Sequence, residues 1–147
     1  MNSGIIIPVA RRTIQLQATS ISGLEAFINK DFEKAVEQIA YGKGRLVVSG
    51  IGKSAIIAQK IVATLNSTGT ASVFMHAADA IHGDLGMIQK EDIILLISKS
   101  GDSPEIKVLL PLIKNFGNIL IGMAGNIHSY LAKHCDILLN TTVEKEA

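Results

Sequence analysis

The sequence predicts an α/β fold built as a three-layer sandwich, with helices on both faces of a five-stranded parallel sheet. Short apolar runs alternate with segments whose apolar residues recur at helical spacing, which is typical of βαβ units with right-handed crossovers. These runs are hydrophobic along their whole length instead of at every second residue. Strands of this kind are buried on both faces, so we expect helices to cover the sheet from both sides.

Each element is expected where the pattern of apolar residues changes. Helices are expected over residues 14–28, 32–39, 54–66, 103–116 and 128–134, and strands over residues 45–49, 72–75, 92–98, 118–124 and 136–140. Residues 1–8 are expected to form an extended lead-in. Asp31 is the expected N-cap of the second helix, and Gly42 to Gly44 are expected to end it.

Length and composition indicate one domain and exclude several classes of protein. The 147 residues predict a single domain, in which residues 1–31 are a helical lead-in to residues 32–147. A net charge of +1 without a basic stripe argues against nucleic-acid binding. No apolar run approaches the about 18 residues of a membrane span. The single Cys135 cannot form an internal disulfide, so we expect a reducing, cytoplasmic location.

A glycine-rich turn follows the first strand, at the edge where parallel sheets bind ligands. Ser49, Gly50 and Gly52 precede a helix whose first N–H groups can receive an anion. A triphosphatase loop is disfavoured because Val47 stands where that motif requires glycine. Gly50 to Ala55 fits a dinucleotide fingerprint, but the second strand lacks the acidic residue that would hold the ribose. A sugar-phosphate site and a purely structural turn remain open.

Three serines follow the third strand. Ser98, Ser100 and Ser103 surround a glycine and lead into a helix that Ser103 can cap. Hydroxyls, backbone N–H groups and a helix N-terminus together predict a cradle for a phosphate monoester. The alternative is a capped helix without a ligand.

The second and fifth strands are followed by further titratable side chains. His76 and His82 lie near two carboxylates but lack a metalloprotease spacing, so we expect no metal. Either histidine can exchange a proton near neutral pH. Glu144 and Glu146 follow the last strand and are expected to reach the same edge of the sheet, although a solvated tail is the alternative.

Five blocks of this sequence resemble sugar isomerase (SIS) domains, and more narrowly D-arabinose 5-phosphate isomerases. The blocks are GIGKS at 50–54, NSTGT at 66–70, HGDLG at 82–86, SKSGDSPEI at 98–106 and EKEA at 144–147. The resemblance implies a flavodoxin-like or Rossmann-like sheet and a homotetramer with its sites at subunit contacts. It implies interconversion of D-ribulose 5-phosphate and D-arabinose 5-phosphate, for synthesis of the eight-carbon acid sugar Kdo of lipopolysaccharide or capsule.

The resemblance also implies roles for individual residues. The family's catalytic positions fall on Lys53, His82, Glu105 and Glu146, and its phosphate-binding serines fall on the three serines after the third strand. In our hypothesis Glu146, or else Glu105, is the base at the carbon. Lys53 polarises the developing oxyanion and His82 moves a proton, without a cofactor. The alternatives are a phosphosugar sensor without turnover and, less favoured, an NAD-binding domain.

The family's domain continues beyond the EKEA block with further helices and another active-site histidine. Many relatives also carry paired regulatory CBS domains. Neither feature is present in these 147 residues. We therefore expect this chain to be a fragment or to hold an incomplete site.

Overall fold

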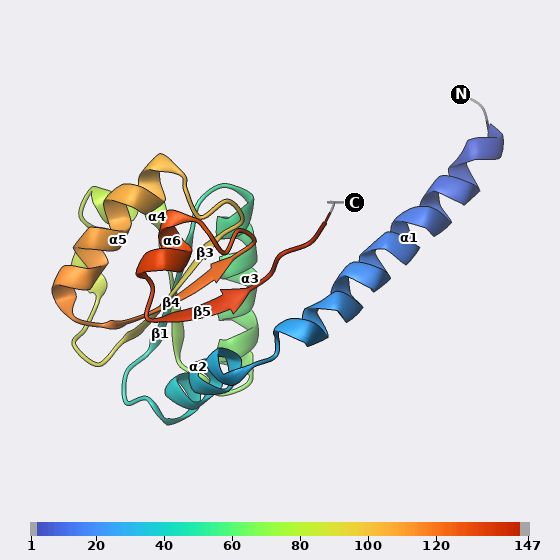
Figure 1. The fold of residues 1–147 in the computed structure, drawn as a ribbon. Helices are drawn as coiled ribbons and strands as arrows, with labels where there is room; N and C mark the ends of the chain where they lie inside the picture. The colour runs from blue at the N-terminus through green and yellow to red at the C-terminus, as the bar shows by residue number, and fades with distance from the viewer. Residues whose placement is uncertain (1–2, 145–147) are drawn as a thin grey trace.

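In the computed structural model, which describes residues 3–144, five parallel strands form one sheet in the order β2-β1-β3-β4-β5 (Figure 1). The strands are β1 (Leu46–Gly50), β2 (Ser72–His76), β3 (Ile93–Ser98), β4 (Ile119–Ala124) and β5 (Ile137–Asn140). All five predicted strands are thus present within one or two residues of the expected bounds. The parallel arrangement confirms the predicted fold class.

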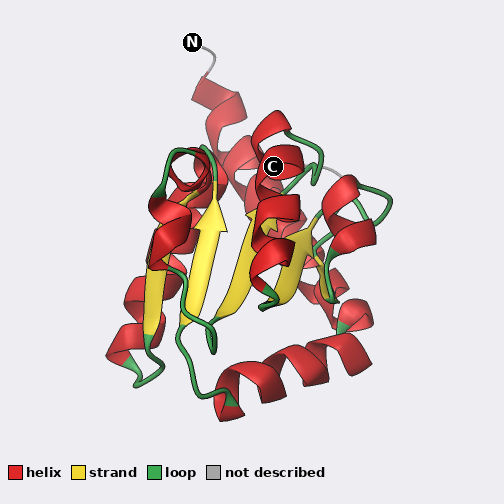
Figure 2. Ribbon diagram, turned by 90° about the vertical axis from the view of Figure 1, so that its left-hand side faces the viewer, coloured by secondary structure: helices red, strands yellow, loops and turns green. Residues whose placement is uncertain are grey.

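Helices cover both faces of the sheet, which completes the three layers (Figure 2). The long helices are α1 (Ile6–Gly23), α2 (Lys30–Tyr41), α3 (Lys53–Ser67) and α5 (Pro104–Phe116). The short ones are α4 (Ala77–Ile81), α6 (Tyr130–His134) and the 3-10 turns η1 (Ser3–Ile5), η2 (Leu24–Phe27) and η3 (Asp84–Met87). Helices α2 and α3 pack on one face, and α4, α5 and α6 pack on the other.

The core explains why the strands are apolar at every position. Val47 and Leu96 face the layer of α4, α5 and α6, whereas Val48 and Ile121 face the layer of α2 and α3, and all four are fully buried. Burial of one such side chain contributes about 1.5–3 kcal/mol relative to exposure. The two clusters together hold the sheet rigid, so its loops project from a fixed frame.

A buried ion pair holds the edge of the sheet where β1 and β3 begin. The Asp92 carboxylate accepts hydrogen bonds from the Arg45 backbone N–H at 2.9 Å, from the Arg45 guanidinium at 2.7 Å and from the Gln89 N–H at 2.9 Å. Burial alone would raise the pKa of Asp92, but these bonds and the Arg45 charge outweigh burial and lower the pKa. The bonds anchor the two central strands to one another.

Two local predictions are wrong, and two short helical segments were not predicted. Residues 3–8 are helical instead of extended, because Pro8 lies in the first turn of α1, where its missing N–H has no partner to lose. Asn29, not Asp31, caps α2, with its side-chain oxygen accepting from the N–H groups of Asp31 and Phe32. The segment after β2 contains α4 and η3, which are too short to show helical periodicity.

Helix α1 projects away from the sheet (Figure 1). Within residues 3–144 the chain buries no side chain of α1. Ile7, Ile14, Ile21 and Ile28 recur every seventh residue at the projecting end of the chain and are 57% to 68% exposed. Among the described residues, no helix has the length and hydropathy needed to cross a bilayer.

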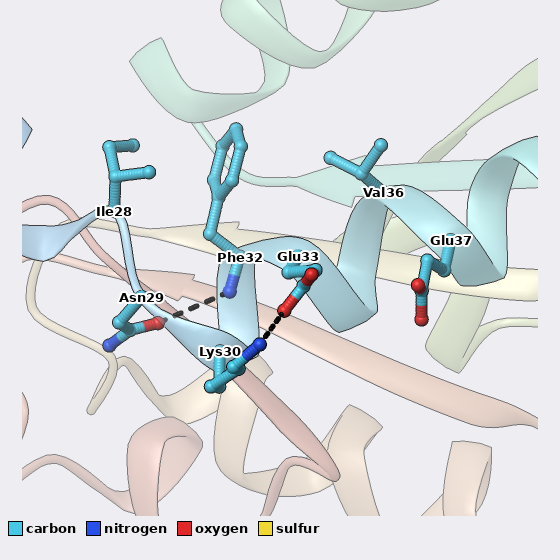
Figure 3. Close-up of a pocket in the computed structure, with 7 residues that line it drawn as sticks. All are labelled: Ile28, Asn29, Lys30, Phe32, Glu33, Val36 and Glu37. Carbon is cyan, nitrogen blue, oxygen red and sulfur yellow. Dashed lines mark hydrogen bonds and ion pairs between the residues drawn. The ribbon is translucent and has the colours of Figure 1, made fainter.

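The projecting end meets the body of the protein at an open apolar groove of about 690 Å³ at the start of α2 (Figure 3). In Figure 3 the side chains of Ile28, Phe32 and Val36 point to the same side, away from the ion pair of Lys30 with Glu33.

Candidate functional site

The carboxyl ends of the parallel strands meet at one edge of the sheet. Gly50 pairs in register with His76 on one side and with Ile97, the neighbour of Ser98, on the other. From β1 the chain passes through α3 to β2, and from β3 through α5 to β4, so the path diverges between β1 and β3. Such a point of divergence leaves a crevice in which α/β proteins bind ligands. The predicted glycine and serine segments both end there.

The glycine turn brings the start of α3 against the end of β1. A side chain at Gly50 would place its Cβ 3.0 Å from the carbonyl carbon of Ser54, which is too close for an unstrained contact. Gly52 has φ 57° and ψ −128°, a conformation open to glycine and strained for other residues. Lys53 is the first residue of α3 and is exposed. The unpaired N–H groups of this 15-residue helix are therefore presented at the edge of the sheet.

We call residues 98–103 the serine loop. Ser98 is buried, and its Oγ accepts a hydrogen bond from the Gly101 N–H at 3.0 Å, which closes the turn. Gly101 has φ 67°, in the left-handed region that favours glycine. Ser100 is exposed, and its Oγ accepts only a long contact of 3.4 Å from the Asp102 N–H. Ser98 thus shapes the loop, and Ser100 faces solvent.

Ser103 lies at the N-cap position of α5, but the predicted capping role of its side chain is wrong, because the hydroxyl makes no cap bond. Its Oγ is buried and has no hydrogen-bond partner among residues 3–144. Pro104 is at the first position of α5 as predicted, where its missing N–H would have had no partner within the helix. A buried hydroxyl without a partner costs about 1–3 kcal/mol, and a polar group bound beside Ser103 would complete its bonding.

Within the described part of the chain, two further buried polar atoms at this edge have no hydrogen-bond partner. Ser49 is fully buried, and its Oγ finds no partner. His76 Nδ1 is also buried, with Asp79 3.7 Å away, beyond hydrogen-bond distance. Buried polar atoms without a partner thus lie on β1, on β2 and in the serine loop, next to the crevice between β1 and β3.

The predicted catalytic residues come from separate loops. Lys53 follows β1, His82 ends α4 after β2, and Glu105 lies half-buried in the first turn of α5 after β3. His82 is exposed, and Gly83, which follows it, has φ 137°. Glu146 lies outside the described residues. Within residues 3–144 no group of three or more His, Cys, Asp or Glu is placed to hold a metal ion.

Residues 125–131 follow β4 and lie against the serine loop, although no role was predicted for them from the sequence. The Gly125 N–H donates to the carbonyl of Lys99 at 3.1 Å. The Thr142 hydroxyl donates to the carbonyl of Gly125 at 3.0 Å, so the last described residues run beside this loop. Apart from the Thr142 hydroxyl, these contacts use backbone groups, so the type of side chain does not mark them in the sequence.

The sequence profile of the SIS domain matches residues 39–147. This chain belongs to the SIS domain family. The match covers the whole sheet, the glycine turn and the serine loop.

Individual relatives agree with this assignment. The SIS domain described here is 51% identical over 138 residues to arabinose 5-phosphate isomerase KdsD of Pseudomonas aeruginosa. The aligned region covers 94% of this chain and 42% of that protein. It is 41% identical over 142 residues to arabinose 5-phosphate isomerase KpsF of Escherichia coli O6:H1, covering 96% of this chain and 43% of that protein. The chain thus spans less than half the length of these curated relatives.

A solved structure supports the fold. The c3406 protein of E. coli CFT073, solved in complex with arabinose 5-phosphate, matches with a TM-score of 0.92 and 37% identity. The match covers 99% of this chain and 78% of that one.

Proposed function

We propose that this SIS domain is part of an aldose–ketose isomerase that interconverts D-ribulose 5-phosphate and D-arabinose 5-phosphate. The observation that carries the proposal is the buried, unpartnered Ser103 hydroxyl beside the start of α5, where a phosphate would complete its bonding. The names of the relatives and the sugar-phosphate complex of the structural neighbour support the choice of sugar. In a cytoplasmic setting the product would supply synthesis of Kdo for lipopolysaccharide or capsule.

The chemistry requires a phosphate anchor, a base at the carbon and a group that stabilises the oxyanion. Ser100 and Ser103, with the N–H groups at the start of α5, form the anchor, because the helix dipole favours an anion there. Lys53, exposed at the start of α3, stabilises negative charge on the sugar oxygens of an enediol. His82 moves the proton between oxygens. The base is a carboxylate, Glu146 or Glu105.

Isotope exchange and a serine variant test the proposal together. In deuterated water, ribulose 5-phosphate is expected to give arabinose 5-phosphate labelled at C2, observed by NMR, because an enediol exchanges its proton with solvent. Ser103→Ala is expected to raise the Kd for arabinose 5-phosphate about tenfold without lowering the melting temperature, because it removes a buried hydroxyl that lacks a partner. The control is Ser67→Ala, an exposed serine at the far end of α3.

The outcomes separate the candidate functions. Unlabelled product would point to hydride transfer and would refute the enediol route. Tight binding without turnover would support the sensor function instead of the isomerase. Unchanged affinity in Ser103→Ala would refute the phosphate anchor.

We also propose that the protein is a homo-oligomer, in line with the tetramer that the family resemblance implies. The described part of the predicted lead-in, residues 3–31, is then an arm of the domain that reaches a second copy. Most of the stability of a protein helix comes from packing of its apolar face, and α1 buries none of its side chains within residues 3–144, so α1 requires a partner surface. Its isoleucines at every seventh position form a seam that fills one of the two core positions in each heptad of a coiled coil. The same seam on each copy is self-complementary, which favours a second copy of this chain as the occupant.

Ile14→Glu tests the seam. We expect this variant to sediment as a smaller species than the wild type, because a buried glutamate carboxylate opposes helix pairing. Gln15→Glu adds the same charge to the adjacent exposed position and is expected to leave the sedimentation coefficient unchanged. An unchanged coefficient for Ile14→Glu, or a monomeric wild type, would contradict the proposed seam.

A further inference from the structure

The serine loop is supported from the side by the loop that follows the neighbouring strand. The Leu131 N–H donates to the carbonyl of Gly101 at 3.0 Å, and the Gly125 N–H donates to the carbonyl of Lys99 at 3.1 Å. A Cβ at Gly101 would lie 2.1 Å from the Ser129 Oγ, so the two loops are in close contact. Residues 125–131 therefore form a wall behind the serine loop.

One side chain of the serine loop reaches across this contact. The Asp102 Oδ1 accepts a hydrogen bond from the Tyr130 N–H at 3.2 Å, and the same atom lies 3.4 Å from the Lys107 Nζ. Tyr130 is the first residue of α6, so its N–H has no partner within that helix.

The two contacts of Asp102 differ in strength. The Asp102 and Lys107 side chains are 42% and 51% exposed, and an ion pair this exposed contributes little. The bond to Tyr130 joins a charged acceptor to a part-buried backbone donor, and such bonds are among the stronger ones. The bond to Tyr130 is therefore the stronger of the two Asp102 contacts, and it adds a side-chain contact to the backbone bonds that join the two loops at Lys99 and Gly101.

Asp102 stands directly between Gly101 and Ser103, so the contact with Tyr130 determines how the serine loop enters α5. We propose that Asp102 is a positioning residue, which holds the Ser103 hydroxyl and the first N–H groups of α5 in place for phosphate through its bond to Tyr130. The inference rests on the proposed function for the identity of the ligand. In this proposal α6 and the β4–α6 loop contribute to phosphate binding through a backbone N–H group and not through their side chains.

Three variants isolate this bond. Asp102→Leu removes the acceptor, Asp102→Asn keeps a carbonyl oxygen that can still accept from Tyr130, and Lys107→Met removes only the ion pair. We expect Asp102→Leu to raise the Kd for arabinose 5-phosphate and for inorganic phosphate about tenfold. Its KM rises by the same factor while kcat changes by less than about twofold, because a phosphate anchor acts alike on ground and transition states. We expect the other two variants to stay within about twofold of the wild type.

Calorimetric titration and steady-state kinetics on the purified protein give these values. Wild-type affinity in Asp102→Leu would overturn the inference, and so would an equal loss in Asp102→Asn. Amide hydrogen exchange at residues 100–103 gives a second, ligand-free readout, expected to be about tenfold faster in Asp102→Leu than in Asp102→Asn. If the wild type binds neither ligand, the proposed function fails, and the exchange rates alone decide whether Asp102 positions the loop.

Discussion

Asp92→Ala is expected to lower the free energy of unfolding by about 3–4 kcal/mol at neutral pH. The Asp92 side chain is only 1% exposed, and its loss leaves Arg45 without its partner and two backbone N–H groups without an acceptor. Urea unfolding of the purified protein measures the effect. Glu91→Ala, at the adjacent exposed position, is the control and is expected to stay within about 0.5 kcal/mol of the wild type.

The role of Asp92 also predicts how the free energy of unfolding changes with pH. The folded pKa of Asp92 is lowered below its unfolded value of about 3.9, so the carboxylate stabilises the fold above that pH. This contribution is lost as the pH falls through the folded pKa. The difference between wild type and Asp92→Ala should therefore be largest above about pH 5 and should shrink as the pH falls below the unfolded pKa of Asp92. A difference that grows on acidification would contradict the assigned role.

Gly101→Ala is expected to weaken binding of arabinose 5-phosphate about 100-fold, because a displacement of about 1 Å in a binding group can have that effect. The position has φ 67°, which costs an alanine about 1–2 kcal/mol, and the added Cβ would lie 2.1 Å from the Ser129 Oγ. The serine loop or the wall behind it must move. Titration calorimetry with arabinose 5-phosphate measures the affinity.

Gly86→Ala is the matched control for this variant. Gly86 lies outside the left-handed region, and a Cβ there would meet no atom within 4 Å. Its affinity should equal that of the wild type. Retention of tight binding by Gly101→Ala would show that the serine loop tolerates displacement and so does not set the phosphate position.

The parts of the fold that the sequence predicts well are those where burial alone decides the residue type. β1 and β3 are surrounded by apolar side chains on both faces, so each of their interior positions must be apolar apart from Ser49. The five residues of α4 are too few to show a period, and Pro8 is compatible with a helix only because it stands in the first turn.

The sequence predicts those parts of the candidate site that depend on the type of residue, and it does not predict the parts that depend on backbone groups. The serine loop and the glycine turn stand out as hydroxyls and glycines at strand ends, and the structure places both at the crevice between β1 and β3. The predicted capping role of Ser103 is wrong. A serine whose hydroxyl caps a helix and a serine whose hydroxyl is buried without a partner can both stand at the N-cap position, so the sequence alone does not distinguish them. The wall of residues 125–131 acts through backbone N–H and carbonyl groups, which all residues share.

The ion pair of Arg45 with Asp92 and the loops of the candidate site lie at opposite ends of the central strands. β1 has five residues, which separates the two ends by about 16 Å. Changes that far apart contribute nearly independently to the free energy of a protein. Substitutions in the loops of the candidate site can therefore accumulate while the ion pair at the opposite end of the strands stays the same.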